Sequence, residues 1–201
     1  MVYLLLLMSQ HTATKGFTLI ELIIVIALIA LLSTTVILVI NPIRLFQEAR
    51  DSQRMADINQ MSRAMSLMLA TNSQPVLGPS PANCYVAKAL QVCTARYVSA
   101  AASTINATSA ANVGFVTGGG WVPVNLGTFP AISAWPVDPT NAIGSATSTF
   151  YSYAYDSANA WEFTAAMESV RYGSSTNVDS MIAKDGGNQP LLYEVGTNVG
   201  L

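Results

Sequence analysis

The feature that most constrains this chain is an apolar run from Phe17 to Ile40, FTLIELIIVIALIALLSTTVILVI, in which Glu21 is the single charged residue. As a helix, these 24 residues would be about 36 Å long at about 1.5 Å per residue, enough to cross a bilayer core of about 30 Å. The run therefore predicts a membrane-spanning helix near the start of the chain.

Composition narrows the classes of function. The chain has 201 residues, of which 10% are charged and 51% hydrophobic, and its formal net charge is -2. These values rule out disorder through excess charge and disfavour a basic nucleic-acid binder. The sequence contains one histidine, His11, and two cysteines, which are too few for a histidine-based triad or a zinc site to be expected.

Three interpretations of the apolar run compete. A cleaved secretory signal needs a small-x-small cleavage site after a short apolar region, and none is convincing near residues 27–33. A plain membrane anchor explains the length. It does not explain a carboxylate inside the run, which costs about 2.5–3.5 kcal/mol at a membrane centre, although Glu21 lies close enough to the end to snorkel. The third interpretation rests on the residues around Glu21.

The segment Lys15–Val25, KGFTLIELIIV, resembles the class III signal of type IV pilins and pseudopilins. The resemblance implies that a membrane-embedded prepilin peptidase cleaves after Gly16 and methylates the new amino terminus at Phe17. It also implies that Glu21, the fifth residue after the cleavage site, pairs with an amino-terminal ammonium group during filament assembly.

Elementary electrostatics agrees with this resemblance. Cleavage would create an α-amino group, largely protonated at neutral pH, four residues before Glu21 on one helix face. Each charge alone is costly in apolar surroundings, and pairing offsets part of that cost. If a neighbouring subunit supplies the amine, we hypothesise that the pair also fixes the axial register of the two subunits.

The leader departs from the family pattern. Residues 2–7 are apolar, whereas leaders of this family are usually short and polar. Translation from Met8 would give MSQHTATKG, which is a typical short leader, so either Met1 or Met8 is the start. His11 is removed in both cases.

Asn41-Pro42 interrupts the apolar run, because proline removes a helical hydrogen bond and disfavours helix at the preceding residue. We expect either a kink within one helix or a simple break between anchor and domain. Apolar residues at spacings of three and four then predict an amphipathic helix to about Thr71, with a methionine stripe packed on a sheet. The expected apolar face contains Ile43, Phe46, Ile58, Met61, Met65 and Met68. The expected polar faces contain Arg44, Glu48, Arg50, Asp51, Arg54, Asp57 and Arg63.

Cys84 and Cys93 follow a loop rich in proline and glycine. A chain with this signal exposes its carboxy-terminal part outside the cytoplasmic membrane, where disulfides persist, so a bridge between the two cysteines is favoured over free thiols. Residues 99–112 are small and of low complexity, and predict a solvated loop or a ragged helix extension. Gly118–Gly120 predicts a turn.

Residues 150–155 and 161–167 alternate with a period of two on either side of the turn at 156–159, which predicts an antiparallel hairpin. The segment Trp135–Pro139, WPVDP, together with this tyrosine-rich hairpin, resembles a loop and hairpin of major pseudopilins and some pilins. Some of those pseudopilins bind calcium in a late acidic loop. The weak calcium candidates here are Asp179, Asp185 and Asn188, and the alternative is a solvated acidic turn.

The expected fold is therefore α+β, with one long amino-terminal helix packed on a small antiparallel sheet. We expect a leader at 1–16, a transmembrane and assembly helix at 17–40, an amphipathic helix at 41–72 and a globular head at 73–201.

The expected function is structural, not enzymatic. The chain would be a single-pass protein of the cytoplasmic membrane that polymerises with itself into a type IV pilus-like filament, with the head outside the cytoplasm. The family implies prepilin peptidase, an assembly platform and an ATPase as partners, and the net acidic charge beyond residue 70 predicts no nucleic-acid partner. The alternative is a pseudopilin of a type II secretion system. An anchored enzyme is the third possibility, because acidic pairs such as Glu162 and Glu168 exist, but nothing in the sequence places them around a pocket.

Overall fold

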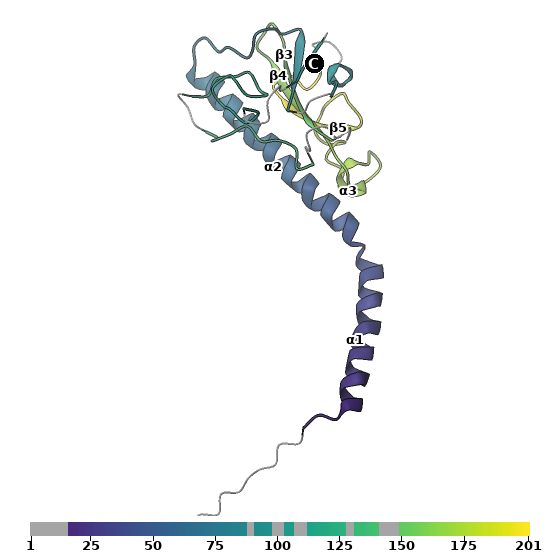
Figure 1. Cartoon of the computed structure of the whole chain (residues 1–201). Coiled ribbons are helices and arrows are strands. Elements are labelled where there is room, and N and C mark those ends of the chain that lie inside the picture. Colours follow the sequence, from purple (N-terminus) through teal and green to yellow (C-terminus); the bar gives the residue numbers. More distant parts are fainter. Residues whose placement is uncertain (1–15, 88–90, 98–102, 107–111, 128–130, 141–148) are drawn as a thin grey trace, which may run out of the picture. The chain divides into compact units, whose positions relative to one another are not determined.

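A computed structural model of the chain describes residues 16–87, 91–97, 103–106, 112–127, 131–140 and 149–201 (Figure 1). The chain divides into two compact units, with the boundary between Pro42 and Ile43. We call the second of these, residues 43–201, the globular unit.

The first unit contains helix α1, Leu19–Ile40, within which Leu19–Ile37 is long and apolar enough to cross a membrane by length and composition. Its described side chains are exposed on every side, which suits a helix surrounded by lipid or by other apolar helices. The helix ends at Asn41, whose φ of 46° is left-handed, and Pro42 begins the next helix. The predicted interruption at Asn41-Pro42 is therefore confirmed.

Helix α2, Pro42–Thr71, ends where the sequence predicts. Its stripe of Ile58, Met61, Met65 and Met68 is buried in the main core of the globular unit, so this part of the expected apolar face is confirmed. The expectation is wrong for the first turns of the helix. Ile43 and Phe46 are largely exposed, because the buried residues of α2 begin only at Asp51.

The expected polar faces need a second correction. Asp51, Arg54 and Asp57 are buried, not solvent-facing. A spacing of three residues places them on the side of α2 that meets the rest of the globular unit. That unit supplies hydrogen-bonding partners for each of them, which is the condition for burying a charged group at tolerable cost.

The sheet has five strands in the order β2-β1-β3-β4-β5. The strands are β1 Asn83–Val86, β2 Ser103–Asn106, β3 Tyr151–Tyr155, β4 Trp161–Ala166 and β5 Leu192–Gly196. The pairs β1–β3, β3–β4 and β4–β5 are antiparallel, whereas β1–β2 is parallel. The α+β class is confirmed, but the sheet is mixed, because β2 runs parallel to β1. Parallel neighbours need a crossover of about a dozen residues or more, and the sequence between these two strands is that long.

The prediction of an irregular or helical segment at 99–112 is wrong for residues 103–106, which form β2. Thr104 and Ile105 pair with β1, and this pairing outweighs a small, polar composition that does not favour a strand by itself. Residues 99–102 and 107–111 lie outside the described residues. The predicted glycine turn is confirmed, because Gly118 has a φ of 88° and a bridge joins Thr117 to Asn125.

The predicted hairpin is confirmed as β3 and β4, with Tyr153 opposite Phe163. Every residue of β3 is buried, because both faces of the sheet are covered. One face carries the tyrosines of β3 and meets α2, which runs along the sheet in Figure 1. The opposite face holds a smaller cluster of Cys84, Val86, Cys93, Tyr97, Phe150, Ala154 and Leu201.

Two short helices lie in the connections. Helix η1, Thr94–Arg96, lies between β1 and β2, and helix α3, Val170–Gly173, lies between β4 and β5. Ser169 caps α3 by accepting a hydrogen bond from the backbone N–H of Tyr172. Neither helix carries an apolar period long enough to be predicted from the sequence.

Candidate functional site

The amino terminus of α1 is a capping box made by Thr18 and Glu21. The Glu21 carboxylate oxygen Oε2 accepts hydrogen bonds from the backbone N–H of Thr18 at 3.1 Å and from its hydroxyl at 2.9 Å. The Thr18 hydroxyl in turn accepts from the backbone N–H of Glu21 at 3.2 Å. Glu21 therefore helps to begin the helix, and its negative charge lies where the helix dipole favours it.

This geometry places the predicted cleavage site next to the predicted assembly residue. Gly16 and Phe17 lie before the helix and are exposed, and nothing surrounds the position of a Gly16 side chain. The Glu21 carboxylate accepts both of its hydrogen bonds from Thr18 on Oε2, so among the described residues Oε1 has no hydrogen-bond donor. An ammonium group brought to this end of the helix would find a free carboxylate oxygen in an otherwise apolar helix.

A second polar constellation joins α2 to the globular unit through the guanidinium of Arg54. Its Nε and Nη2 donate to the two oxygens of Asp138 at 2.6 and 3.0 Å, which is a bidentate pair. Its Nη1 donates to Asp51 at 2.7 Å, and Nη2 also pairs with Glu168. The side chains of Arg54 and Asp51 are fully buried, and that of Asp138 almost fully.

Asp51 extends the same cluster to α3. Its carboxylate accepts from the backbone N–H groups of Glu168 and Ser169, with a shortest distance of 2.7 Å to Ser169. Arg50 pairs with Glu168 from the outer side. One helix thus fixes the loop before β3, through Asp138, and the turn after β4, through Glu168.

The electrostatics of this cluster favour ionised groups in spite of burial. Burial alone would raise the pKa of Asp138, but the hydrogen bonds from Arg54 and Thr140 lower it below its ordinary value. Burial opposes the charge of Arg54, yet Asp138, Glu168 and Asp51 together raise its pKa. Every charged group in the cluster has at least one oppositely charged partner, which is the pattern of a structural joint.

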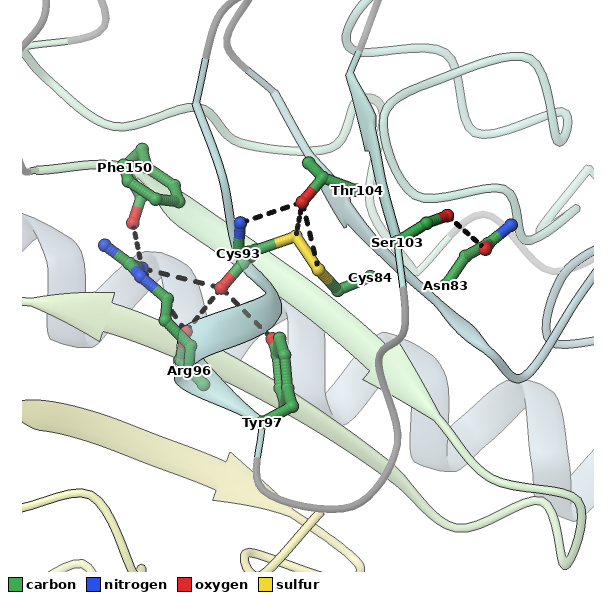
Figure 2. The surroundings of a disulfide bond; sticks show 10 residues. Asn83, Cys84, Cys93, Arg96, Tyr97, Ser103, Thr104 and Phe150 are labelled. Atoms are coloured by element: carbon green, nitrogen blue, oxygen red, sulfur yellow. Dashed lines mark hydrogen bonds between the residues drawn. A yellow bond between two sulfur atoms is a disulfide. The ribbon is translucent and has the colours of Figure 1, made fainter.

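The predicted disulfide between Cys84 and Cys93 is confirmed, with a Cα–Cα distance of 6.0 Å. It joins β1 to the residue before η1, and Figure 2 shows Thr104 of β2 against both sulfur atoms. The Thr104 hydroxyl also accepts from the backbone N–H of Cys93 at 3.0 Å. The bridge therefore stabilises the parallel edge of the sheet.

Arg96 lies beside this disulfide, on the face of the sheet opposite α2. Its guanidinium stacks 3.5 Å from the ring centroid of Phe150 and donates to the Phe150 carbonyl at 2.8 Å. Further hydrogen bonds reach Ser152 and Thr164. Burial lowers the pKa of Arg96 to about 10.

Two buried glutamates lie on the same face, and their pairing was not predicted from the sequence. Glu162 of β4 and Glu194 of β5 are each about 1% exposed. Oε2 of Glu162 accepts from the backbone N–H of Leu201, and Oε2 of Glu194 from that of Gln189, whereas the Oε1 atoms have no partner among the described residues. Burial, reinforced by Glu194, raises the pKa of Glu162 to about 9.

The acidic pair considered in the sequence is separated by the fold. Glu168 belongs to the Arg54 cluster, and Glu162 lies on the opposite face of the sheet. The sequence offered one signal that Glu162 is buried. Glu162 and Thr164 alternate with Trp161 and Phe163, so they lie on the other face of the strand, and that face can also be covered.

The calcium candidates have protein partners in the structure. Asp179 accepts from Arg171 at 3.2 Å. Asp185 accepts from the backbone N–H groups of Gly187 and Glu194 at 3.0 and 2.8 Å, which closes the loop before β5. Within the described ranges no three acidic, cysteine or histidine side chains are placed to hold a metal ion. The calcium site, including Asn188, stays a prediction.

Comparison with known proteins bears on the amino-terminal part of the chain. Residues 12–37 match the family model described as the prokaryotic N-terminal methylation motif. No curated protein and no solved structure matches the chain. The chain therefore carries the class III signal peptide of type IV pilins and pseudopilins, as the sequence predicts. The motif supports a type IV pilin-like or pseudopilin precursor and indicates a structural protein.

The Arg54 cluster predicts a large loss of stability when one partner is removed. Asp138→Asn should lower the free energy of unfolding by about 3–5 kcal/mol, because Arg54 would keep a buried charge without its bidentate partner. The matched control is Asp179→Asn, which breaks a surface pair with Arg171 and should cost less than about 1 kcal/mol. Urea unfolding of the full chain in uncharged detergent, followed by tryptophan fluorescence, measures both. Equal losses in the two variants would contradict the role assigned to the cluster.

The raised pKa of Glu162 predicts a pH dependence of stability opposite in sign to that of an ion-paired acid such as Asp138, whose pKa is lowered. The pKa of Glu162 is about 9 in the folded chain against an ordinary 4.5, so its contribution to stability is complete below about 4.5 and is lost as the pH rises towards 9. Glu162→Gln should therefore flatten the decline of the unfolding temperature between these pH values and raise stability at pH 8. If the unfolding temperature fell equally with pH in wild type and variant, Glu162 would ionise freely in the folded state and the prediction would be wrong.

Proposed function

We propose that the protein is the structural subunit of a type IV pilus-like filament. Prepilin peptidase cleaves between Gly16 and Phe17 and methylates the new amino group of Phe17, and the mature chains polymerise through α1. The observation that carries the proposal is the position of Glu21: a capped carboxylate in the first turn of an exposed apolar helix, one turn from the cleavage site.

The physics of assembly requires a polar interaction of this kind. Lipid tails are as apolar as the side chains of α1, so transfer of α1 from the bilayer into a filament gains little from the hydrophobic effect. Close packing and the pairing of opposite charges must therefore supply the free energy of assembly. Glu21 of one subunit and the amino group of Phe17 in a neighbour are suited to this, because each is costly alone in apolar surroundings.

The globular unit is consistent with a filament subunit exposed outside the cytoplasm. Its Cys84–Cys93 disulfide suits an oxidising compartment, and the Arg54 cluster fixes the sheet to the helix that continues the anchor. Self-assembly, an assembly platform protein and an ATPase are the partners that this function implies. Before assembly the chain would be stored as a single-pass protein of the cytoplasmic membrane.

The second candidate function is that of a pseudopilin in a type II secretion system. The observation that favours it is the loop Trp135–Pro139, whose Asp138 is tied to Arg54 and which resembles a loop of major pseudopilins. A calcium ion held by Asp179, Asp185 and Asn188 would belong to this function. Gene neighbourhood separates the two candidates: a secretin with secretion components favours the pseudopilin, and retraction ATPases favour the pilus.

The processed amino terminus is the first prediction of this function. Mass spectrometry of the product made in cells with prepilin peptidase should show Phe17 as the first residue, N-methylated, with a loss of two hydrogens for the disulfide. Cells without the peptidase should yield the longer chain. An intact leader in both strains would contradict the proposal.

The second prediction of this function concerns the charge of Glu21. Glu21→Ala should be cleaved normally but should reduce filament yield by more than about a hundredfold, which corresponds to a lost pair of about 3–5 kcal/mol. Glu21→Gln separates the two roles of this residue, because glutamine preserves a capping box but carries no charge. Sheared-filament yield and cleavage are measured in the same cultures. Normal filaments from Glu21→Gln would show that the cap, not the charge, is what assembly requires.

A further inference from the structure

Two arginines line one small pocket of the globular unit, beside the first turns of α2. Arg44, in the first turn of α2, and Arg171, in α3, line a pocket of about 260 Å³ together with Glu48, Val170 and Asp179. Figure 1 shows α3 beside the lower part of α2. We call this region, the first turns of α2 with residues 169–179, the cationic edge after its two guanidinium groups, whose charge Glu48 and Asp179 balance.

The two guanidinium groups are available to an external ligand. Arg44 has no ion pair or side-chain hydrogen bond with any described residue. Arg171 makes single contacts of 3.4 Å to Glu48 and 3.2 Å to Asp179 from a side chain that is 48% exposed. Such surface pairs contribute little and exchange easily, and guanidinium groups bind phosphate oxygens well.

Exposed apolar side chains belong to the same two segments of the chain. Val170 of α3 lines the pocket, and it is more than half exposed, as are Ile43, Leu45 and Phe46 of α2 and Val178 after α3. Large apolar groups next to arginine are unusual on a surface that meets only water, but typical of one that lies in the headgroup layer of a membrane.

Chain connectivity keeps this edge close to the bilayer. Helix α1 has 22 residues, about 33 Å, which matches a hydrocarbon core of about 30 Å, so its end at Ile40 lies near the headgroups when the span is inserted. Arg44 follows four residues later and cannot be more than about 15 Å away along the chain. Lipid phosphates at the end of α1 are therefore within reach of Arg44 along the chain.

We propose that the cationic edge docks on anionic phospholipid headgroups while the subunit is stored in the membrane. Arg44 and Arg171 bind the headgroup phosphates, and the flanking apolar side chains enter the interface. Beyond residue 70 the chain has four basic and seven acidic residues, a net charge of -3, which disfavours a long polyanion such as a nucleic acid as the ligand. The inference requires the membrane anchor but not filament assembly.

The test uses the full chain in lipid nanodiscs of phosphatidylcholine alone or with phosphatidylglycerol. A fluorophore on Val178→Cys reports docking through quenchers placed in the lipid, and hydrogen exchange of residues 169–180 in the unlabelled chain gives an independent measurement. Phosphatidylglycerol should increase quenching and slow the exchange. Arg44→Gln and Arg171→Gln should each reduce the docking equilibrium about fivefold, and the double variant about 25-fold.

Arg63→Gln is the matched control, because Arg63 is an exposed arginine of α2 outside the cationic edge. Docking that falls equally in Arg63→Gln and Arg44→Gln, or that is the same in both lipids, would overturn the proposal. Inorganic phosphate, compared with chloride at equal ionic strength, should not release the edge from phosphatidylglycerol; release would assign the pocket to free phosphate. Energy transfer between labelled copies that depends on Arg44 would assign the edge to a second copy of this chain.

Discussion

The globular unit depends on one buried cation, Arg54. A guanidinium group without water must be surrounded by acceptors, and here Asp51, Asp138 and Glu168 come from three separate parts of the chain to provide them. This requirement fixes the position of α2, of the loop before β3 and of the turn after β4 relative to one another. The apolar core of methionines and aromatic rings supplies cohesion, whereas the charge cluster specifies which surfaces meet.

The amino-terminal helix and its methylation motif could be predicted from the sequence. Their information is local: the apolar run, the Gly16–Phe17 junction and Glu21 are all contained in one short segment, and Asn41-Pro42 marks the end of the helix. The capping bonds between Thr18 and Glu21 are likewise a matter of residues three apart. The hairpin was also predictable, because period-two alternation and a turn are local signals.

The remaining features depend on contacts between distant residues. Nothing near Asp51 or Arg54 in the sequence shows that their partners lie more than eighty residues away, so both were assigned to solvent. The strand at 103–106 exists because β1 offers it a free edge and the disulfide holds the connection in place. Glu162 and Glu194 meet only through the register of β4 and β5, which one-dimensional patterning does not reveal.

Asn41 has a mechanical consequence. Two stiff rods, α1 and α2, are joined through the torsion angles of a single left-handed residue, followed by a proline that cannot continue the hydrogen-bond ladder. If the protein is the filament subunit proposed above, a change in the Asn41 torsion angles alone would let the same two helices follow the different axes of a lipid bilayer and of a helical fibre.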